Sequence, residues 1–213
     1  MEQSEQLFSN DFRAEFDRLL QWQRDVRRFR TDPVDDALVD RCLATFNLAP
    51  SVGLSEPWRI VRLASDGARA SALTNFEAQN QKALAGYSGE KAKIYASLKL
   101  SGMRDAPVQL AVYCDEYTAK GSGLGAGTMP EMRRYSVVGA ITQFWLMARA
   151  WGLGVGWVSI LDPEQLTRDL DVPKGWQLVA YLCVGWPWEN AGTPELERAG
   201  WEDRSTTLKY LVR

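Results

Sequence analysis

The chain has 213 residues, of which 46% are hydrophobic and 24% charged, and its formal net charge is −2 at pH 7. A chain of this length can bury a sizeable core and lies near the upper limit of one domain, so we expect a single domain over residues 1–213. It contains no run of five like charges, so neither a nucleic-acid surface nor a polybasic membrane anchor is expected.

The start of the chain lacks the basic residues and the apolar run of a signal peptide. No stretch approaches the roughly 20 consecutive apolar residues that span a bilayer. We therefore expect a cytoplasmic protein whose partners are small molecules or a second copy of itself.

Histidine is absent, and the three cysteines, Cys42, Cys114 and Cys183, lie far apart among apolar residues. We expect the cysteines to be small buried thiols and not a disulfide frame or a metal site. Without histidine, Ser-His-Asp hydrolysis, Cys-His hydrolysis and His-ligated metal chemistry are excluded. Proton transfers would have to use carboxylates, Ser, Tyr, Lys or a cofactor.

The first helix is predicted over residues 10–24, so that Asp25 falls where this helix ends. Its apolar stripe consists of Phe12, Phe16, Leu19 and Leu20. A second helix is predicted over residues 35–47, where Leu38, Cys42 and Phe46 recur at helical spacing.

Capping signals predict two later helices. Thr128 and Glu131 have capping-box spacing, which predicts a helix to about residue 150, and Asp162 opens another in the same way. The apolar face predicted for the longer helix comprises Val138, Ile141, Trp145 and Ala148. Trp145 and Trp176 are expected to pack in the core, whereas Trp58 and Trp157 remain open to a ligand.

Strands are predicted over residues 59–64, 107–115, 155–160 and 176–186. Between the first two strands, residues 66–104 predict two helices that break near 86–89 and carry few large apolar residues, so they should form a cover and not deep core. Residues 118–127 predict a flexible loop, and 187–213 a tail across a surface. Strands too few for a sandwich, with several helices, predict an α+β fold in which helices cover a mixed sheet.

The first constellation with chemical potential follows the first helix. Arg24, Arg27 and Arg28 lie close enough together to hold a phosphate through forked hydrogen bonds, and Asp25 is a carboxylate set among them. The alternative is an ordinary solvated basic helix end, where cations also favour the helix dipole.

Two turns form the other constellations. Ser51 lies in a Pro/Gly turn before the first strand, where it can face a planar ligand or belong to a plain connection. Residues 152–156 carry three glycines before Trp157 and Ser159. They are not a dinucleotide fingerprint, because here a helix precedes the glycines and a strand follows them. The alternative is a tight turn into a core strand, with Ser159 two residues past Trp157 on the same strand face.

Together these segments resemble the nitroreductase superfamily, which has an Arg-rich motif after the first helix, an Ala-Pro-Ser turn and a Gly-rich turn into a Gly-Trp strand. The resemblance covers about residues 10–204. It is closest to the branch that fragments flavin to 5,6-dimethylbenzimidazole, because Asp25 stands where ordinary nitroreductases usually carry serine. Residues 88–103 resemble the lid of that branch, and 154–160 its serine-bearing strand.

The resemblance implies a nitroreductase-like α+β fold, with a mixed central sheet flanked by helices, a helical lid over about 66–104 and an extended tail over 187–213. It implies a homodimer with FMN at the interface. Reduced FMN and dioxygen would be the substrates, and 5,6-dimethylbenzimidazole, the lower ligand of cobalamin, would form with erythrose 4-phosphate. A separate flavin reductase would supply the reduced FMN.

Carried over position by position, the resemblance makes Asp25 and Ser159 the catalytic pair. Asp25 would be the general base toward the ribityl chain, and Ser159 would orient the flavin by hydrogen bonding. The implied FMN contacts are Gln23, Arg24, Asp25, Val26, Arg27, Ser51, Leu98, Gly156, Trp157, Ser159 and Arg204.

Four positions depart from the family pattern: Gln23, Glu56, Arg59 and Ala96. Gln23 stands where the family usually has arginine, so one phosphate contact would be weakened or supplied by Arg28 or Arg204. These departures bear on affinity more than on reaction type. Two other functions remain open: an NAD(P)H-dependent nitroreductase or related flavin dehalogenase, and a flavin-binding module without catalysis.

Overall fold

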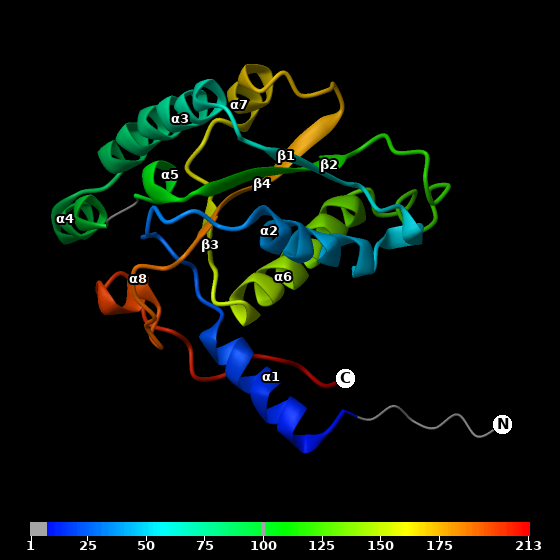
Figure 1. Ribbon diagram of the computed structural model, residues 1–213, viewed down its shortest axis with the longest axis horizontal. Coiled ribbons are helices and arrows are strands. Elements are labelled where there is room, and N and C mark those ends of the chain that lie inside the picture. Colours follow the sequence, from blue (N-terminus) through cyan, green and yellow to red (C-terminus); the bar gives the residue numbers. More distant parts are fainter. Residues whose placement is uncertain (1–7, 99–100) are drawn as a thin grey trace.

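The computed structural model describes residues 8–98 and 101–213, and their strands form one four-stranded sheet flanked by helices (Figure 1). The strands are β1 (Trp58–Arg62), β2 (Val108–Asp115), β3 (Gly154–Val158) and β4 (Trp176–Gly185). The α-helices are α1 (Asn10–Trp22), α2 (Asp36–Leu43), α3 (Asp66–Ala85), α4 (Gly89–Ser97), α5 (Gly102–Asp105), α6 (Met132–Ala150), α7 (Pro163–Asp169) and α8 (Glu195–Arg198). Two 3₁₀ turns, η1 (Ala44–Leu48) and η2 (Val52–Leu54), precede β1.

The sheet has the order β1-β2-β4-β3, and each neighbouring pair is antiparallel. A parallel bridge joins Asp25 to Val155 of β3, so the segment after α1 lies beside that strand. These features confirm the predicted fold class, a sheet covered by helices.

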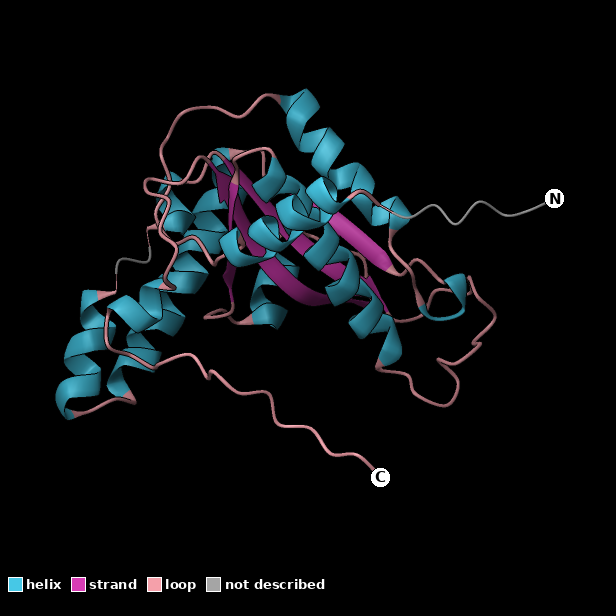
Figure 2. Cartoon of the chain, turned by 90° about the horizontal axis from the view of Figure 1, so that it is seen from below, coloured by secondary structure: helices cyan, strands magenta, loops and turns pink. Residues whose placement is uncertain are grey.

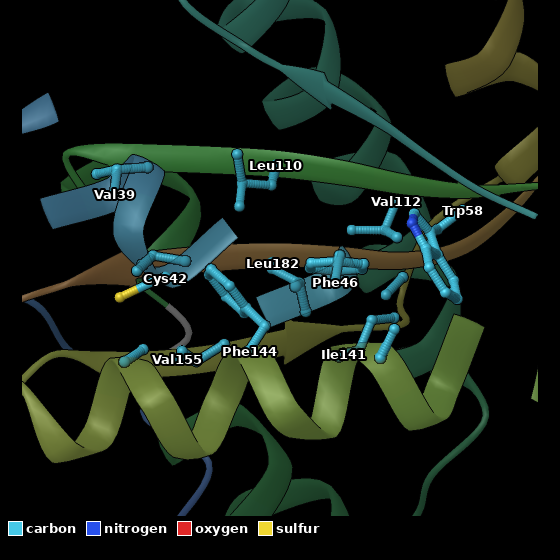
Figure 3. Close-up of a cluster of buried hydrophobic side chains, with 14 of the residues drawn as sticks. Val39, Cys42, Phe46, Trp58, Leu110, Val112, Ile141, Phe144, Val155 and Leu182 are labelled. Atoms are coloured by element: carbon cyan, nitrogen blue, oxygen red, sulfur yellow. The ribbon is translucent and has the colours of Figure 1, made fainter. Parts of the chain in front are cut away.

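β2 is buried on both faces, which makes the sheet the middle layer of the molecule. Its residues Leu110 and Val112 belong to a core cluster with α2, η1 and α6, whereas Ala111 and Tyr113 belong to a cluster with α3 and α7. Figure 3 shows the first cluster, with side chains of α6 and η1 pointing toward those of the sheet. Burial on both faces accounts for the continuous apolar run that predicted this strand.

Cys42, Cys114 and Cys183 are free and buried, as the sequence predicted. Burial raises the pKa of each thiol, and that of Cys114 reaches about 12. All three are therefore neutral thiols at physiological pH.

The predicted capping box at Thr128 is wrong. α6 begins at Met132, and its N-cap residue, Glu131, makes no side-chain hydrogen bond at the cap. The chain before it forms a series of turns, with positive φ at Gly121, Gly123 and Gly125. The turns continue past Thr128 before the helix begins, so Thr128 lies too far before Met132 to cap α6. In contrast, the Asp162 cap is confirmed, because its carboxylate accepts a hydrogen bond from Gln165 N at 2.9 Å.

Val138 is also placed wrongly in the predicted core face of α6, because it is 38% exposed. The buried stripe comprises Val137, Ala140, Ile141, Phe144 and Ala148, which is rotated by about one position. Trp145 packs partly against the first core cluster and Trp176 against the second, as expected, and Trp58 joins the first.

The lid region differs from the expectation in two ways. The predicted break at 86–88 is confirmed, but a third short helix, α5, follows it. α3 is more than a cover, because Ala72 and Phe76 are buried in the second core cluster and Asn75 is buried as well. Beyond α8 the chain forms no helix or strand and runs away from the body (Figure 2).

Among the described residues, no helix combines the length and the apolar character needed to cross a membrane.

Candidate active site

The segment after α1 is held by the main chain of β3. α1 ends at Trp22, and Gln23 is extended. Val26 N then donates to Val155 O at 3.0 Å, and a second bridge joins Phe29 to Pro187. The segment therefore runs as an added strand, which fixes where its side chains point.

The glycines of β3 allow this approach. A Cβ at Gly156 would lie 2.1 Å from the carbonyl oxygen of Val26, and a Cβ at Gly154 would lie 2.8 Å from a methyl group of Val26. Real side chains do not reach such distances, so only glycine lets the two stretches of backbone pack together.

The Asp25 carboxylate is held by two donors. Oδ1 accepts from Trp157 N at 3.0 Å, and Oδ2 accepts from Arg27 Nε at 3.0 Å. The Asp25 side chain remains 40% exposed, whereas that of Arg27 is 17% exposed. These bonds orient the carboxylate and leave it accessible from the cleft beside it.

This cleft, which we call the ring cleft, has a volume of about 120 Å³ and is lined by Asp25, Arg27 and residues 156–160. Its other wall comprises Phe76 of α3, Met103 of α5 and Cys183 of β4. The structure thus brings Asp25 and Ser159 into one cleft with an apolar wall and a polar wall. Ser159, however, lies just beyond β3, which ends at Val158, so the predicted strand to residue 160 is two residues too long. The chain leaves the sheet there to reach the cap of α7.

A second cleft lies on the other side of the same segment and is rich in arginine. Its lining includes Arg24, Arg28, Arg149 and Arg198. Arg28 and Arg198 share Glu189, at 2.5 and 2.8 Å. Arg24 and Arg149 have no carboxylate within ion-pair distance among the described residues. The arginine cleft therefore carries positive charge that an oxyanion would neutralise.

Arg149 is a buried cation, and burying its charge costs folding free energy. It is 7% exposed, its Nε is buried without an acceptor in the described structure, and one terminal nitrogen donates to Asn190 Oδ1 at 2.8 Å. Its guanidinium lies 4.6 Å from the centre of the Trp22 ring. Burial lowers the pKa of Arg149, and burial together with the nearby Arg204 charge lowers the pKa of Arg24.

The other predicted contacts are more scattered. Ser51 lines neither cleft, and its Oγ accepts from Glu56 N at 3.0 Å within the turn before β1. Leu98 follows α4 outside both clefts, and Gln23 is the C-cap of α1. Arg204 lies close enough to Arg24 for its positive charge to lower the pKa of Arg24.

The departures from the family pattern have local partners. Glu56 pairs with Lys120, and Arg59 pairs with Asp115 at 2.8 Å while lying over the Trp176 ring. Ala96 is exposed on α4. None of these three residues lines the ring cleft.

Sequence reasoning missed Arg149, Phe76 and Met103. Arg149 had a signal, because it lies four residues after Trp145, next to the apolar face of a long helix. Phe76 and Met103 had none, because apolar residues that line a cleft look the same in sequence as apolar residues of the core.

The sequence profile of the Nitroreductase family matches residues 20–186, from the end of α1 to the end of the sheet. This chain belongs to the nitroreductase family. It is 56% identical over 198 residues to the 5,6-dimethylbenzimidazole synthase of Rhodospirillum rubrum, covering 93% of this chain and 94% of that protein. It is 46% identical over 200 residues to the 5,6-dimethylbenzimidazole synthase of Rhodobacter capsulatus, covering 94% and 97%. The predicted family and the expectation of an oxidoreductase are confirmed.

Solved structures agree on the fold. The crystal structure of oxidized iodotyrosine deiodinase bound to FMN and 3-iodo-L-tyrosine superposes with a TM-score of 0.70 at 18% identity, covering 92% of this chain and 96% of that one. This likeness confirms the nitroreductase-like fold.

Proposed function

We propose that this enzyme fragments reduced FMN with dioxygen to give 5,6-dimethylbenzimidazole, the lower ligand of cobalamin, with erythrose 4-phosphate as co-product. The observation that carries the proposal is the oriented Asp25 carboxylate, which opens into the same cleft as the Ser159 hydroxyl. The 56% identity to the 5,6-dimethylbenzimidazole synthase of Rhodospirillum rubrum supports it. A separate flavin reductase would supply the reduced FMN, in the cytoplasm.

The two clefts fit the two ends of FMN. The unmatched charge of Arg24 and Arg149, and the buried Nε of Arg149 without an acceptor, suit a phosphate. The ring cleft offers an apolar wall that includes Phe76 and Met103, against which a planar group can pack. FMN would thus lie across the segment 23–28, with its phosphate toward Arg24, Arg27 and Arg204.

The residues that line the ring cleft then have defined roles. Asp25 takes a proton from the ribityl chain, because its carboxylate is held in one orientation by Trp157 N and Arg27. Ser159 donates or accepts a hydrogen bond at the flavin edge, and α3, α4 and α5 exclude bulk water. Bound in its reduced form, FMN supplies the electrons that activate dioxygen.

A second copy of the chain is the proposed partner. Phe12 and Phe16 on the exposed face of α1 form a row with Phe8, which precedes the helix, and the rings stack in series at 4.5 and 6.1 Å between centroids. α1 has no buried residue of its own, although its apolar stripe was predicted from the sequence. An exposed aromatic row of this kind marks an association surface.

We expect the double variant Phe12→Glu, Phe16→Glu to be monomeric, because four added charges per dimer would have to be buried. Light scattering coupled to size-exclusion chromatography measures the mass. Tyr117→Glu, an exposed aromatic position in the loop after β2, is the matched control and should leave the mass unchanged. If the double variant has the same mass as the unmodified protein, α1 does not form the interface.

The function is tested by photoreducing FMN in the presence of the protein, admitting air, and measuring 5,6-dimethylbenzimidazole by mass spectrometry. We expect the product to form in proportion to the FMN consumed. Quantitative return of intact FMN would refute the proposal and favour a flavin-binding module. Rapid bleaching of the FMN-loaded protein by NADPH would favour a nitroreductase.

A further inference from the structure

Asn75 connects the lid helix α3 to the main chain just beyond Ser159. It is 7% exposed. Its Nδ2 donates to Asp162 O at 2.9 Å, and its Oδ1 accepts from Asp162 N at 2.8 Å. The side-chain amide therefore pairs with both polar atoms of one peptide residue, as a neighbouring strand would.

This pair holds one end of the short stretch that carries Ser159. At the other end, Val158 is the last residue of β3 and pairs with Tyr181 of β4. Asp162 is held a second time, because its carboxylate caps α7 through Gln165 N. Among the described residues, no other side chain makes a hydrogen bond to the main chain of 159–162. Asn75 is thus the side chain that fixes where this stretch leaves the sheet.

The same turn of α3 carries Phe76, which lines the ring cleft together with Ser159. The Asn75 pair therefore ties the helix that bears Phe76 to the stretch that bears Ser159. A hydroxyl that must meet one atom of a bound ring depends on where this stretch is held, since displacement of a reacting group by about 1 Å can cost about 10²-fold in rate.

We infer that Asn75 is a positioning residue for the reaction, acting through Ser159. The inference rests on the proposed function, because that function gives Ser159 its role. If the Asn75 pair were merely a structural bond between α3 and α7, its loss would lower stability and change nothing else.

The matched pair of variants is Asn75→Ala and Thr45→Val. Thr45 is also a buried polar residue, and its Oγ1 donates to Cys42 O at 2.7 Å, in the part of the core on the other face of the sheet. Both variants should lower the melting temperature. Only Asn75→Ala should divert reduced FMN from benzimidazole to intact reoxidised FMN, with a yield about 10- to 100-fold lower per folded molecule. An unchanged partition in Asn75→Ala would overturn the inference.

A double-mutant cycle with Ser159→Ala tests the path of the effect. If Asn75 acts through Ser159, the variant that carries both substitutions should yield no less benzimidazole than Ser159→Ala alone. Losses that multiply would show that Asn75 acts independently of Ser159 and would overturn the inference.

Hydrogen exchange in the flavin-free protein gives a readout independent of activity. The amides of residues 158–162 should exchange faster in Asn75→Ala than in the unmodified protein or in Thr45→Val. Equal exchange in all three proteins would overturn the positioning role. If the unmodified protein forms no benzimidazole, the proposed function is refuted. The exchange comparison still tests whether Asn75 fixes the Ser159 stretch, because it does not depend on product formation.

Discussion

Asp25→Asn is expected to lower benzimidazole formation by about 10² to 10⁴-fold, the range typical of an acid–base group, while FMN binding stays near that of the unmodified protein. The amide oxygen can still accept from Trp157 N, so the side chain keeps its place. It cannot accept a proton at neutral pH, and its NH₂ group cannot accept from Arg27 Nε. The measurements are benzimidazole yield after photoreduction and FMN affinity by fluorescence titration.

Asp32→Asn is the matched control, because Asp32 forms the same kind of pair two residues from an arginine, with Arg30 at 2.8 Å. It lies outside both clefts, so its loss should leave the yield unchanged. If Asp25→Asn forms as much product as the unmodified protein, Asp25 is not the base.

Gly156→Ala is expected to remove most FMN binding, because the new Cβ would meet the Val26 carbonyl oxygen at 2.1 Å. The clash is with backbone, so the segment 23–28 must move away from β3. We expect a stability loss of about 1–3 kcal/mol, as for overpacking in a core. Displacement of Arg24 and Arg27 should lower FMN affinity at least about tenfold, since charge-assisted hydrogen bonds contribute about 1.5–3 kcal/mol each.

The control for this change is Gly67→Ala at the start of α3, where a Cβ would meet nothing within 4 Å. It should bind FMN as the unmodified protein does. Thermal melting and FMN titration of the two variants give the comparison. Normal affinity in Gly156→Ala would mean that the docked segment does not hold the flavin.

β2 and β4 could be predicted from the sequence to within one residue at each end, and β1 and β3 to within two. β2 and β4 are long apolar runs because both faces of the sheet are covered, and such runs have clear ends. The start of α6 could not be predicted in this way, because a capping-box spacing also occurs in turns. The chain forms turns at the glycines of 121–125, and α6 begins only at Met132, after Thr128.

The candidate site was only partly predictable. Asp25, Gly156 and Ser159 were found through motifs, but the reason for the glycines was not, since no local pattern tells that Val26 packs against them. The Asn75 pair joins residues 87 positions apart, and neither Asn75 nor Asp162 has a sequence signal for the other. Arg149 was overlooked because a charge beside an apolar helix face usually lies in solvent.

The docking of residues 23–28 on β3 separates two properties of the enzyme. Main-chain atoms of Val155 and Trp157 hold Val26 and Asp25 in place, whatever side chains stand at 23, 24 and 28. Those three side chains can therefore change without moving the carboxylate, so a weaker phosphate contact at Gln23 would leave Asp25 in place. Affinity and chemistry can diverge independently in this chain because different atoms determine each of them.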